Sequence, residues 1–243
     1  MTKQIFKTFF NWSTGKDSAI ALHYLLKNDE LSVDHLVTTI NKHHNRVTMH
    51  GLRIELLLKQ IDSIGLPCST IELPEQPSME EYNRLMKKEI SELKKQGFTD
   101  CGFGDIFLED LRSYREQQLK DIKCHFPLWK RNTKDLFLEF INLGFKAIVI
   151  CVNGELLDPS FLGRKLDHKF LKDLPNNVDP CGENGEFHTF CYDGPIFSYK
   201  IEFELGEKTL KQYKTPNGEA NDKTDYWFID LESRIAHNSG PNS

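Results

Sequence analysis

The residues most able to do chemistry lie in a short turn, Ser13–Ser18 (STGKDS), between an apolar run and an amphipathic one. A turn from a strand into a helix points successive backbone N–H groups at one spot, and the helix dipole adds positive potential there. Gly15 permits the close approach of an anion, and Lys16 adds charge. The hydroxyls of Ser13 and Ser18 can donate hydrogen bonds. The turn therefore predicts a phosphate-binding loop.

Asp17 does not suit a bare phosphate, but it suits the first turn of a helix or a phosphate-bound Mg²⁺. The alternative to a phosphate loop is an ordinary helix N-cap built on Ser13 or Thr14, because caps favour these residue types. With one glycine before Lys16, the spacing fits neither the GxxxxGK[ST] loop nor the GxGxxG loop.

A second polar group lies in residues 182–190 (GENGEFHTF). Its two carboxylates and one imidazole, Glu183, Glu186 and His188, could bind the charged group of a substrate or move a proton. Its two glycines would let the segment fold tightly towards a ligand. The alternative is a solvated turn with aromatic residues buried behind it.

Two further positions follow strand-like runs. Asp105, after Gly104, could hold Mg²⁺ or orient the acceptor, although the helix dipole also favours a carboxylate at that place. Thr38 and Thr39 end another strand-like run, so they would lie at the edge of a parallel sheet where ligands bind.

The elements that must position these residues alternate between strands and helices over the first half of the chain. We expect strands at 5–12, 33–40, 68–73, 100–106 and 123–127, and helices at 17–27, 51–64, 78–96 and 108–120. This rhythm predicts a five-stranded, doubly wound parallel sheet of the α/β class, which binds ligands beyond the carboxyl ends of its strands.

The rhythm changes after residue 127. A helix at 133–143 and a strand at 145–152 precede a polar region, 153–185, and β-like runs at 186–192, 196–205 and 226–231. We therefore predict an α/β domain at 1–128, which contains the phosphate loop, and a smaller α+β domain at 129–235. The tail, 236–243, is expected to be disordered.

Composition excludes several classes of protein. The 243 residues carry a net charge of −5, which argues against a broadly cationic nucleic-acid coat. No apolar run is long enough to span a bilayer, and the N-terminus lacks the pattern of a signal peptide. The six cysteines show no CxxC or zinc spacing. We expect a cytoplasmic protein.

The turn at 13–18 resembles the SGGxDS loop of the PP-loop ATP pyrophosphatases, which split ATP to AMP and pyrophosphate, with Thr14 at the place of the usual first glycine. Other blocks resemble the diphthine–ammonia ligase family and occur in its order over roughly residues 5–205. They are Gly104-Asp105-Ile106, FPLW at 126–129, GFKAIVICV at 144–152, GENGEFHTF at 182–190 and Asp193-Gly194-Pro195.

The resemblance implies a nucleotide-binding α/β domain with a smaller second domain, ATP and Mg²⁺ as cofactors, and ammonia as the amine donor. It implies adenylation of a carboxylate, with a modified histidine on the translocation elongation factor as the acceptor. The implied nucleotide-binding residues are Ser13, Thr14, Gly15, Lys16, Asp17, Ser18, Thr38, Thr39 and Gly104. The implied catalytic residues are Lys16, Asp17, Asp105, Glu183, Glu186 and His188, with Asp17 and Asp105 as Mg²⁺ ligands.

One departure leaves the acceptor open. The family's usual GEGGEYET is GENGEFHT here, so Phe187-His188 replaces a Tyr-Glu pair. Two other classes also stay open: a PP-loop enzyme that modifies a tRNA base, and a nucleotide sensor without turnover. The net charge and the lack of a paired catalytic cysteine count against the first. The intact Lys16, Asp17 and Ser18 count against the second.

Overall fold

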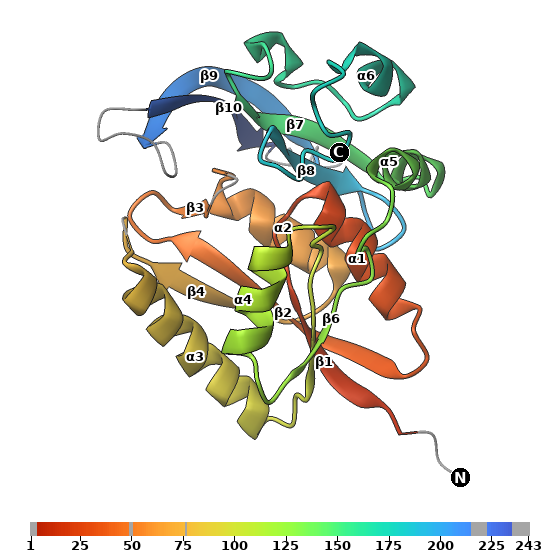
Figure 1. Ribbon diagram of the computed structural model, residues 1–243, viewed down its shortest axis with the longest axis vertical. Helices are drawn as coiled ribbons and strands as arrows, with labels where there is room; N and C mark the ends of the chain where they lie inside the picture. The colour runs from red at the N-terminus through yellow and green to blue at the C-terminus, as the bar shows by residue number, and fades with distance from the viewer. Residues whose placement is uncertain (1–3, 49–50, 76, 215–222, 235–243) are drawn as a thin grey trace, which may run out of the picture.

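The computed structural model describes residues 4–48, 51–75, 77–214 and 223–234, which form two sheets placed one above the other in Figure 1. The lower sheet contains β1 (Phe6–Asn11), β2 (Leu31–Asn41), β3 (Arg46–Val47), β4 (Cys68–Leu73), β5 (Asp100–Gly102) and β6 (Lys123–His125). The upper sheet contains β7 (Lys146–Asn153), β8 (Phe187–Asp193), β9 (Phe203–Lys214) and β10 (Lys223–Ser233). The expected tail at 236–243 lies outside the described residues.

Five strands of the lower sheet are parallel, in the order β4-β2-β1-β5-β6. The chain moves outward from β1 to β4 and then crosses to β5 on the other side, so the order reverses between β1 and β5. Ligands bind at such a reversal, beyond the carboxyl ends of the strands. The predicted α/β class with five parallel strands is confirmed. The short β3, antiparallel to β2, was not predicted.

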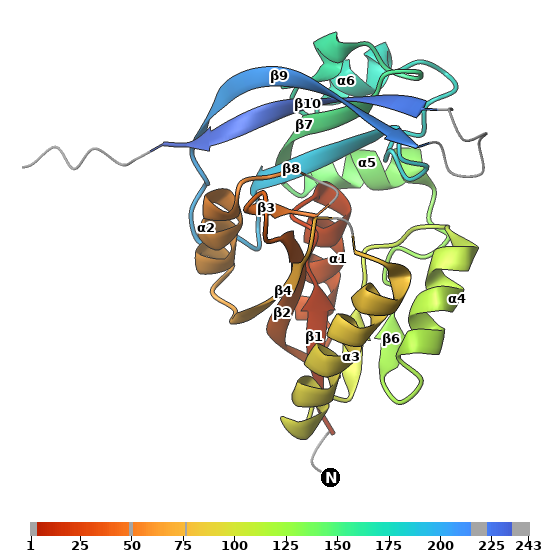
Figure 2. The same ribbon diagram turned by 90° about the vertical axis from the view of Figure 1, so that its left-hand side faces the viewer.

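Helices cover both faces of the lower sheet, as Figures 1 and 2 show: α1 (Lys16–Leu26) and α2 (Ile54–Ile64) on one face, α3 (Met79–Lys95) and α4 (Glu109–Gln118) on the other. Alternation along β1 sends Phe10 to the core on the α1 side and Phe9 to the core on the α3 side. Ser78 caps α3, since its Oγ accepts a hydrogen bond from the Glu81 N–H at 3.1 Å.

The upper sheet is antiparallel, in the order β8-β7-β10-β9. It carries α5 (Thr133–Asn142), a 3₁₀ turn (Pro159–Phe161) and α6 (His168–Asp173). The 3₁₀ turn and α6 lie in the polar region at 153–185, for which no helix was predicted. Helix α6 forms there because Asp167 caps it, accepting from the Phe170 N–H at 2.7 Å.

The strand predicted at 196–205 is wrong, since β9 begins only at Phe203. The preceding residues turn back onto α2 instead. The Ser198 N–H donates to the Ser63 carbonyl at 2.8 Å, and Ser63 Oγ donates to the Tyr199 carbonyl at 2.6 Å. The two isoleucines of the run, Ile196 and Ile201, are buried in the core that also contains residues of α2, so the apolar pattern of the run did not mark a strand. Likewise β5 is shorter than predicted, because the chain leaves the sheet after Gly102.

One apolar core continues from α1 and α2 into β7 and β8. Polar contacts also cross the junction. Asp230 of β10 receives Arg53 Nη2 at 2.5 Å and Arg46 Nη1 at 2.8 Å. Burial alone would raise the pKa of Asp230, but the hydrogen bonds and charges of the two arginines lower it to about 2.

No helix among the residues described above is both long and apolar enough to pass through a bilayer.

We expect Asp230→Asn to lower the free energy of unfolding by about 1–3 kcal/mol at neutral pH, because it removes the charge that both arginines bind. The native pKa lies below the ordinary value of 3.8, so this stabilisation is present above pH 4 and is lost as the pH falls towards 2. Denaturant unfolding at several pH values measures it. Glu232→Gln, an exposed partner of the same Arg53, is the control and should change little. If the free energies of unfolding of Asp230→Asn and the natural protein differed by the same amount at pH 4 and at pH 2, the pKa of Asp230 would not be lowered as described.

Candidate functional site

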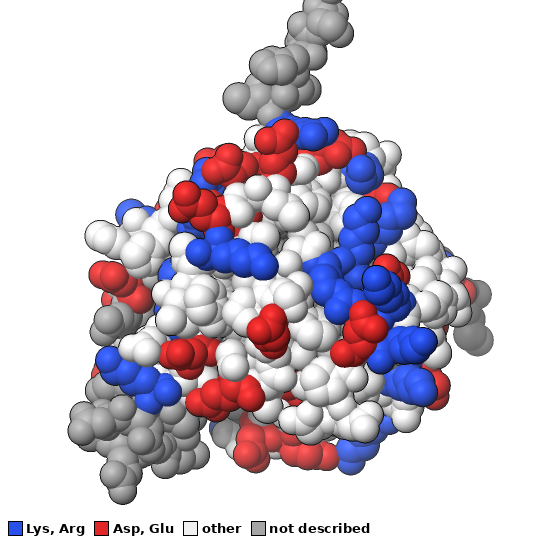
Figure 3. All heavy atoms as spheres, turned by 90° about the horizontal axis from the view of Figure 1, so that it is seen from above, with Lys and Arg blue, Asp and Glu red and all other residues white. Residues whose placement is uncertain are grey.

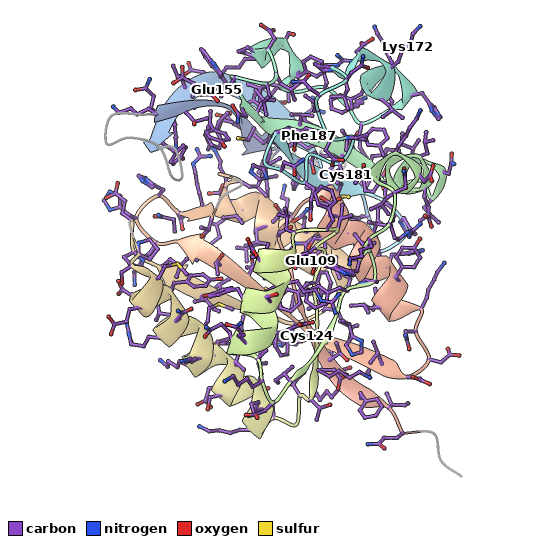
Figure 4. All side chains as sticks on the ribbon, viewed as in Figure 1. Glu109, Cys124, Glu155, Lys172, Cys181 and Phe187 are labelled. Carbon is purple, nitrogen blue, oxygen red and sulfur yellow. The ribbon has the colours of Figure 1, made fainter. Side chains whose placement is uncertain are left out.

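A cavity of about 370 Å³ opens at the carboxyl ends of β1, β2 and β5, where the two sheets meet. Its size is typical of a small-molecule site. Its described lining includes most of the residues singled out from the sequence: Ser13, Gly15, Lys16, Asp17, Ser18, Thr38, Thr39, Gly104, Asp105, Glu183 and His188. Figure 4 places Cys181 and Phe187, which also line the cavity, at the junction of the sheets above the start of α1.

The turn at 13–18 leads directly from β1 into α1. Gly15, which has no side chain, is the N-cap residue of α1, in extended backbone, and the first N–H of the helix, on Lys16, donates to Thr189 Oγ1 of β8. The alternative of an ordinary cap on Ser13 or Thr14 is therefore wrong. Ser18 Oγ instead accepts from the Ser13 N–H at 3.0 Å, which closes the turn on itself. A helix N-terminus at a cavity wall can bind an anion through the N–H groups of its first turn.

Thr14 shapes this turn from behind. Its φ of 74° is left-handed, a conformation that costs free energy outside glycine. Its side chain is fully buried and is not among the described residues that line the cavity. The threonine therefore does not narrow the cavity. Its carbonyl accepts from the Cys191 N–H and from Gln60 Nε2, both at 3.0 Å.

Lys16 is held by residues of both sheets. Its Nζ lies 2.6 Å from Asp17 Oδ2 and donates to the carbonyl of Cys181, while its N–H donates to Thr189 Oγ1 at 3.1 Å. Burial alone would lower the pKa of Lys16, but the carboxylate of Asp17 raises it overall. The ammonium is therefore charged, although the side chain is only 4% exposed.

Gly104 and Asp105 lie against the same turn. A Cβ on Gly104 would meet the Asp17 carbonyl carbon and the Ser18 nitrogen at 3.0 Å, so glycine permits this close packing. Asp105 forms a two-point ion pair with Arg115, with Oδ2 2.8 Å from Nε and Oδ1 3.1 Å from Nη2. Burial raises the pKa of Asp105, against the effect of Arg115.

Glu183 comes to the cavity from the upper sheet's side. Its Oε1 accepts from the Ile106 N–H at 2.7 Å, which ties this loop to the chain after β5. Burial raises the pKa of Glu183 to about 7, and the nearby carboxylate of Asp17 adds to the rise. This carboxyl can therefore hold or release a proton near neutral pH.

Glu186 and His188 differ in their placement. Glu186 is buried and accepts from the Asp179 N–H at 3.0 Å and from the Asn184 N–H at 2.9 Å. It organises its own loop and is not among the described residues that line the cavity, which argues against direct catalysis. His188 does line it, and burial lowers the pKa of His188 to about 4, so its imidazole is neutral.

Two residues of this region were missed from the sequence. Gln60 is fully buried in α2, and its place one helical turn after Leu56 and Leu57 was the signal in the sequence that could have found it. Thr48 follows β3, which was not predicted. Its Oγ1 is buried, lines the cavity and has no hydrogen-bond partner in the described parts of the chain. Such an atom calls for an explanation, and a ligand supplies one.

The described residues contain no group of three or more His, Cys, Asp or Glu side chains that could hold a metal ion. Asp17 and Asp105 both face the cavity, each beside a basic side chain. A Mg²⁺ site on these two carboxylates stays a prediction. It would need phosphate oxygens as further ligands, which is usual for Mg²⁺.

Comparison with known proteins decides the family. A family model described as the diphthamide synthase N-terminal domain matches residues 6–123, and one described as the C-terminal domain matches residues 132–221. The chain belongs to the diphthine–ammonia ligase family. The resemblance seen in the sequence motifs is thereby confirmed.

Individual relatives match over shorter stretches. Diphthine–ammonia ligase from Bos taurus is 41% identical over 85 residues, covering 33% of this chain and 32% of the relative. The Homo sapiens enzyme is 40% identical over 88 residues, 34% and 33% of the two chains. The match thus spans about a third of the length of these relatives. Among solved structures, the U34-tRNA thiolase from Methanococcus maripaludis with its [4Fe-4S] cluster covers 58% of each chain at 16% identity and a TM-score of 0.37. That similarity is too low to bear on function.

We expect Glu183→Gln to stabilise the ligand-free protein by about 1–3 kcal/mol above pH 7 and to have little effect near pH 4.5. The native pKa of about 7 exceeds the ordinary 4.5, so the native state holds the proton more tightly and stability falls as the pH rises between these values. Denaturant unfolding across this range measures it.

Glu186→Gln is the matched control. Its new amide would meet the N–H donors of Asp179 and Asn184, so it should destabilise the protein at every pH in the series. If Glu183→Gln changed stability equally at both ends of the range, Glu183 would not titrate as described.

Proposed function

We propose that this protein is an ATP-dependent ligase that adenylates a carboxylate and transfers ammonia to it. One observation carries the proposal: the N-terminus of α1 and the buried Lys16 face a cavity that the second sheet completes, in a chain of the diphthine–ammonia ligase family. Backbone N–H groups and a retained ammonium suit the triphosphate of a nucleotide.

The cavity has two features that fit ATP. At one end, the turn at 13–18 and the close-packed Gly104 form a cradle for phosphate. At the other end lie Thr38 and Thr39 of β2, and Thr48, whose hydroxyl has no hydrogen-bond partner among the described residues. We assign the base of the nucleotide to this second end, because its hydroxyls can hydrogen-bond a purine edge.

The proposed reaction has two steps. A carboxylate oxygen of the acceptor attacks the α-phosphorus of ATP and pyrophosphate leaves; ammonia then attacks the acyl carbon, forming the amide and releasing AMP and a proton. Lys16 and the N-terminus of α1 would stabilise the charge that grows on the leaving pyrophosphate. Mg²⁺, when bound by Asp17 and Asp105, would supply further charge neutralisation.

The second step releases a proton, because ammonia gains positive charge as it attacks. Glu183 is the side chain suited to take it, since its pKa of about 7 lets it accept a proton near neutral pH. His188, with a pKa of about 4, stays neutral near pH 7 and would not take up this proton.

We propose a modified histidine on the translocation elongation factor as the acceptor, which would make the protein cytoplasmic. The first alternative is a different acceptor molecule that also carries a carboxylate. It is suggested by the neutral His188 at the cavity wall, where the family usually has a glutamate.

The tRNA alternative gains no support. The face in Figure 3 shows Lys and Arg gathered on the side of α6, with Asp and Glu between and around them, rather than a cationic field. At the described cavity wall Cys181 is the cysteine present, and burial raises the pKa of its thiol far above the ordinary value, which suppresses the nucleophilic thiolate.

We expect Lys16→Ala and Asp17→Ala each to reduce AMP formation by at least about a hundredfold, because the first removes the ammonium of the phosphate cradle and the second removes the carboxylate that keeps Lys16 charged and would hold Mg²⁺. The assay is release of AMP and pyrophosphate from ATP with candidate acceptors and ammonia. Lys42→Ala, an exposed lysine just after β2, is the control and should turn over normally. Full turnover by either cradle variant would rule out the assigned roles.

We expect Thr48→Val to raise the KM for ATP by about threefold to tenfold and to leave kcat nearly unchanged, because it removes one hydrogen bond to the base while keeping the side chain's shape. Thr70→Val, on the exposed part of β4, is the matched control. An unchanged KM for ATP would place the base elsewhere in the cavity.

A further inference from the structure

Gln60 lies outside the cavity lining but is bound to the residues that shape it. This α2 side chain is fully buried. Its Oε1 accepts from Trp12 Nε1 at 3.0 Å, and its Nε2 donates to the carbonyl of Thr14 at 3.0 Å and to that of Cys191 at 2.6 Å. Both amide hydrogens and the amide oxygen are therefore used, which fixes the orientation of the group.

The bond to Thr14 sets one peptide plane of the phosphate turn. A trans peptide is planar, so its carbonyl and the following N–H point in opposite directions. With the Thr14 carbonyl held towards Gln60 and the Cys191 N–H, the Gly15 N–H points the other way. A carbonyl turned into the cradle would instead repel phosphate.

This arrangement needs support, because Thr14 has a φ of 74°. A non-glycine residue keeps such a conformation only where its surroundings impose it. The two donors on the Thr14 carbonyl are the groups that impose it here, one from α2 and one from β8. Removing Gln60's donor takes away one of the two described hydrogen bonds to this carbonyl.

The bond to Cys191 extends the effect to the upper sheet. Strand β8 also supplies Thr189, whose hydroxyl accepts from the Lys16 N–H, and His188 at the cavity wall. Gln60 thus ties the phosphate turn and β8 to the same amide, so that both keep one relative position.

We propose that Gln60 is a positioning residue for ATP: its amide sets the peptide plane of the phosphate turn and the place of β8 beside it, and so determines affinity for the phosphates of the nucleotide. This inference rests on the proposed ATP chemistry. Its specific consequence is that loss of the amide weakens binding of phosphates and not of the nucleoside.

Ser63 provides a matched control on the same helix. It is buried, lies one turn after Gln60 and also joins the two sheets, with Oγ 2.6 Å from the Tyr199 carbonyl and 3.1 Å from the Tyr199 nitrogen. The phosphate turn is not among the partners of Ser63 in the described structure. Ser63→Ala therefore reports the effect of a lost interface hydrogen bond by itself.

The experiment compares Gln60→Met, close in size but without hydrogen bonds, with Ser63→Ala and the natural protein. Calorimetric titration gives the Kd of ATP and of adenosine, and thermal unfolding gives Tm. We expect Gln60→Met to weaken ATP binding by at least about tenfold while changing adenosine binding less than about twofold. We expect Ser63→Ala to lower Tm and to leave both Kd values unchanged.

Gln60→Glu adds a readout that a loss of packing would not change. A protonated carboxyl can donate one hydrogen bond to a carbonyl, whereas a carboxylate would repel both carbonyls. ATP affinity relative to the natural protein should therefore recover as the pH falls from about 8 to about 5.5.

Three results would overturn the inference. If Gln60→Met lowered the Tm but kept the natural ratio of ATP to adenosine affinity, the role of Gln60 would be merely structural. A Gln60→Glu protein with no pH-dependent recovery would contradict the role of the donor. If the natural protein bound ATP no better than adenosine, the proposed ATP chemistry itself would fail, and this assignment with it.

Discussion

The carbonyl of Thr14 receives two hydrogen bonds, one from the N–H of Cys191 in the upper sheet and one from the buried amide of Gln60. These bonds hold a threonine in a left-handed conformation at the turn between β1 and α1. The turn alone, at the edge of the lower sheet, would lack this support. The geometry of the phosphate cradle is thus a property of the junction between the sheets, and both halves of the chain are needed to build it.

The same junction sets the charges around the cavity. Lys16 remains an ammonium because Asp17 stabilises its charge after burial, and the Cys181 carbonyl gives it a further acceptor. Burial has opposite effects on the two groups from the 182–190 loop and β8. It raises the pKa of Glu183 to about 7 and lowers the pKa of His188 to about 4. The site therefore holds the fixed positive charge of Lys16 and, in Glu183, a carboxyl that can exchange a proton.

Sequence reasoning reached the parts of this site that depend on local chain direction. A glycine and a lysine between a strand and a helix predict an anion site, and alternating elements predict the sheet edge where it lies. The lining of the cavity could not be derived in full, because it depends on contacts distant in sequence. Glu186 shares a polar segment with Glu183, yet its carboxylate is used within its own loop, and only the fold distinguishes the two. The start of the run at 196–205 likewise packs on α2, and a strand begins only at Phe203. Its apolar pattern could not distinguish the two outcomes, because burial against a helix requires apolar residues as a strand does.

The most direct test of the account is a crystal structure of the protein with a non-hydrolysable ATP analogue and Mg²⁺. The account predicts phosphate density against the turn at 13–18, with the Thr14 carbonyl still directed towards Gln60 and the base beyond β2 near Thr48. Nucleotide bound at another place, with the turn unoccupied, would contradict the assignment of this cradle and the ligase chemistry that depends on it.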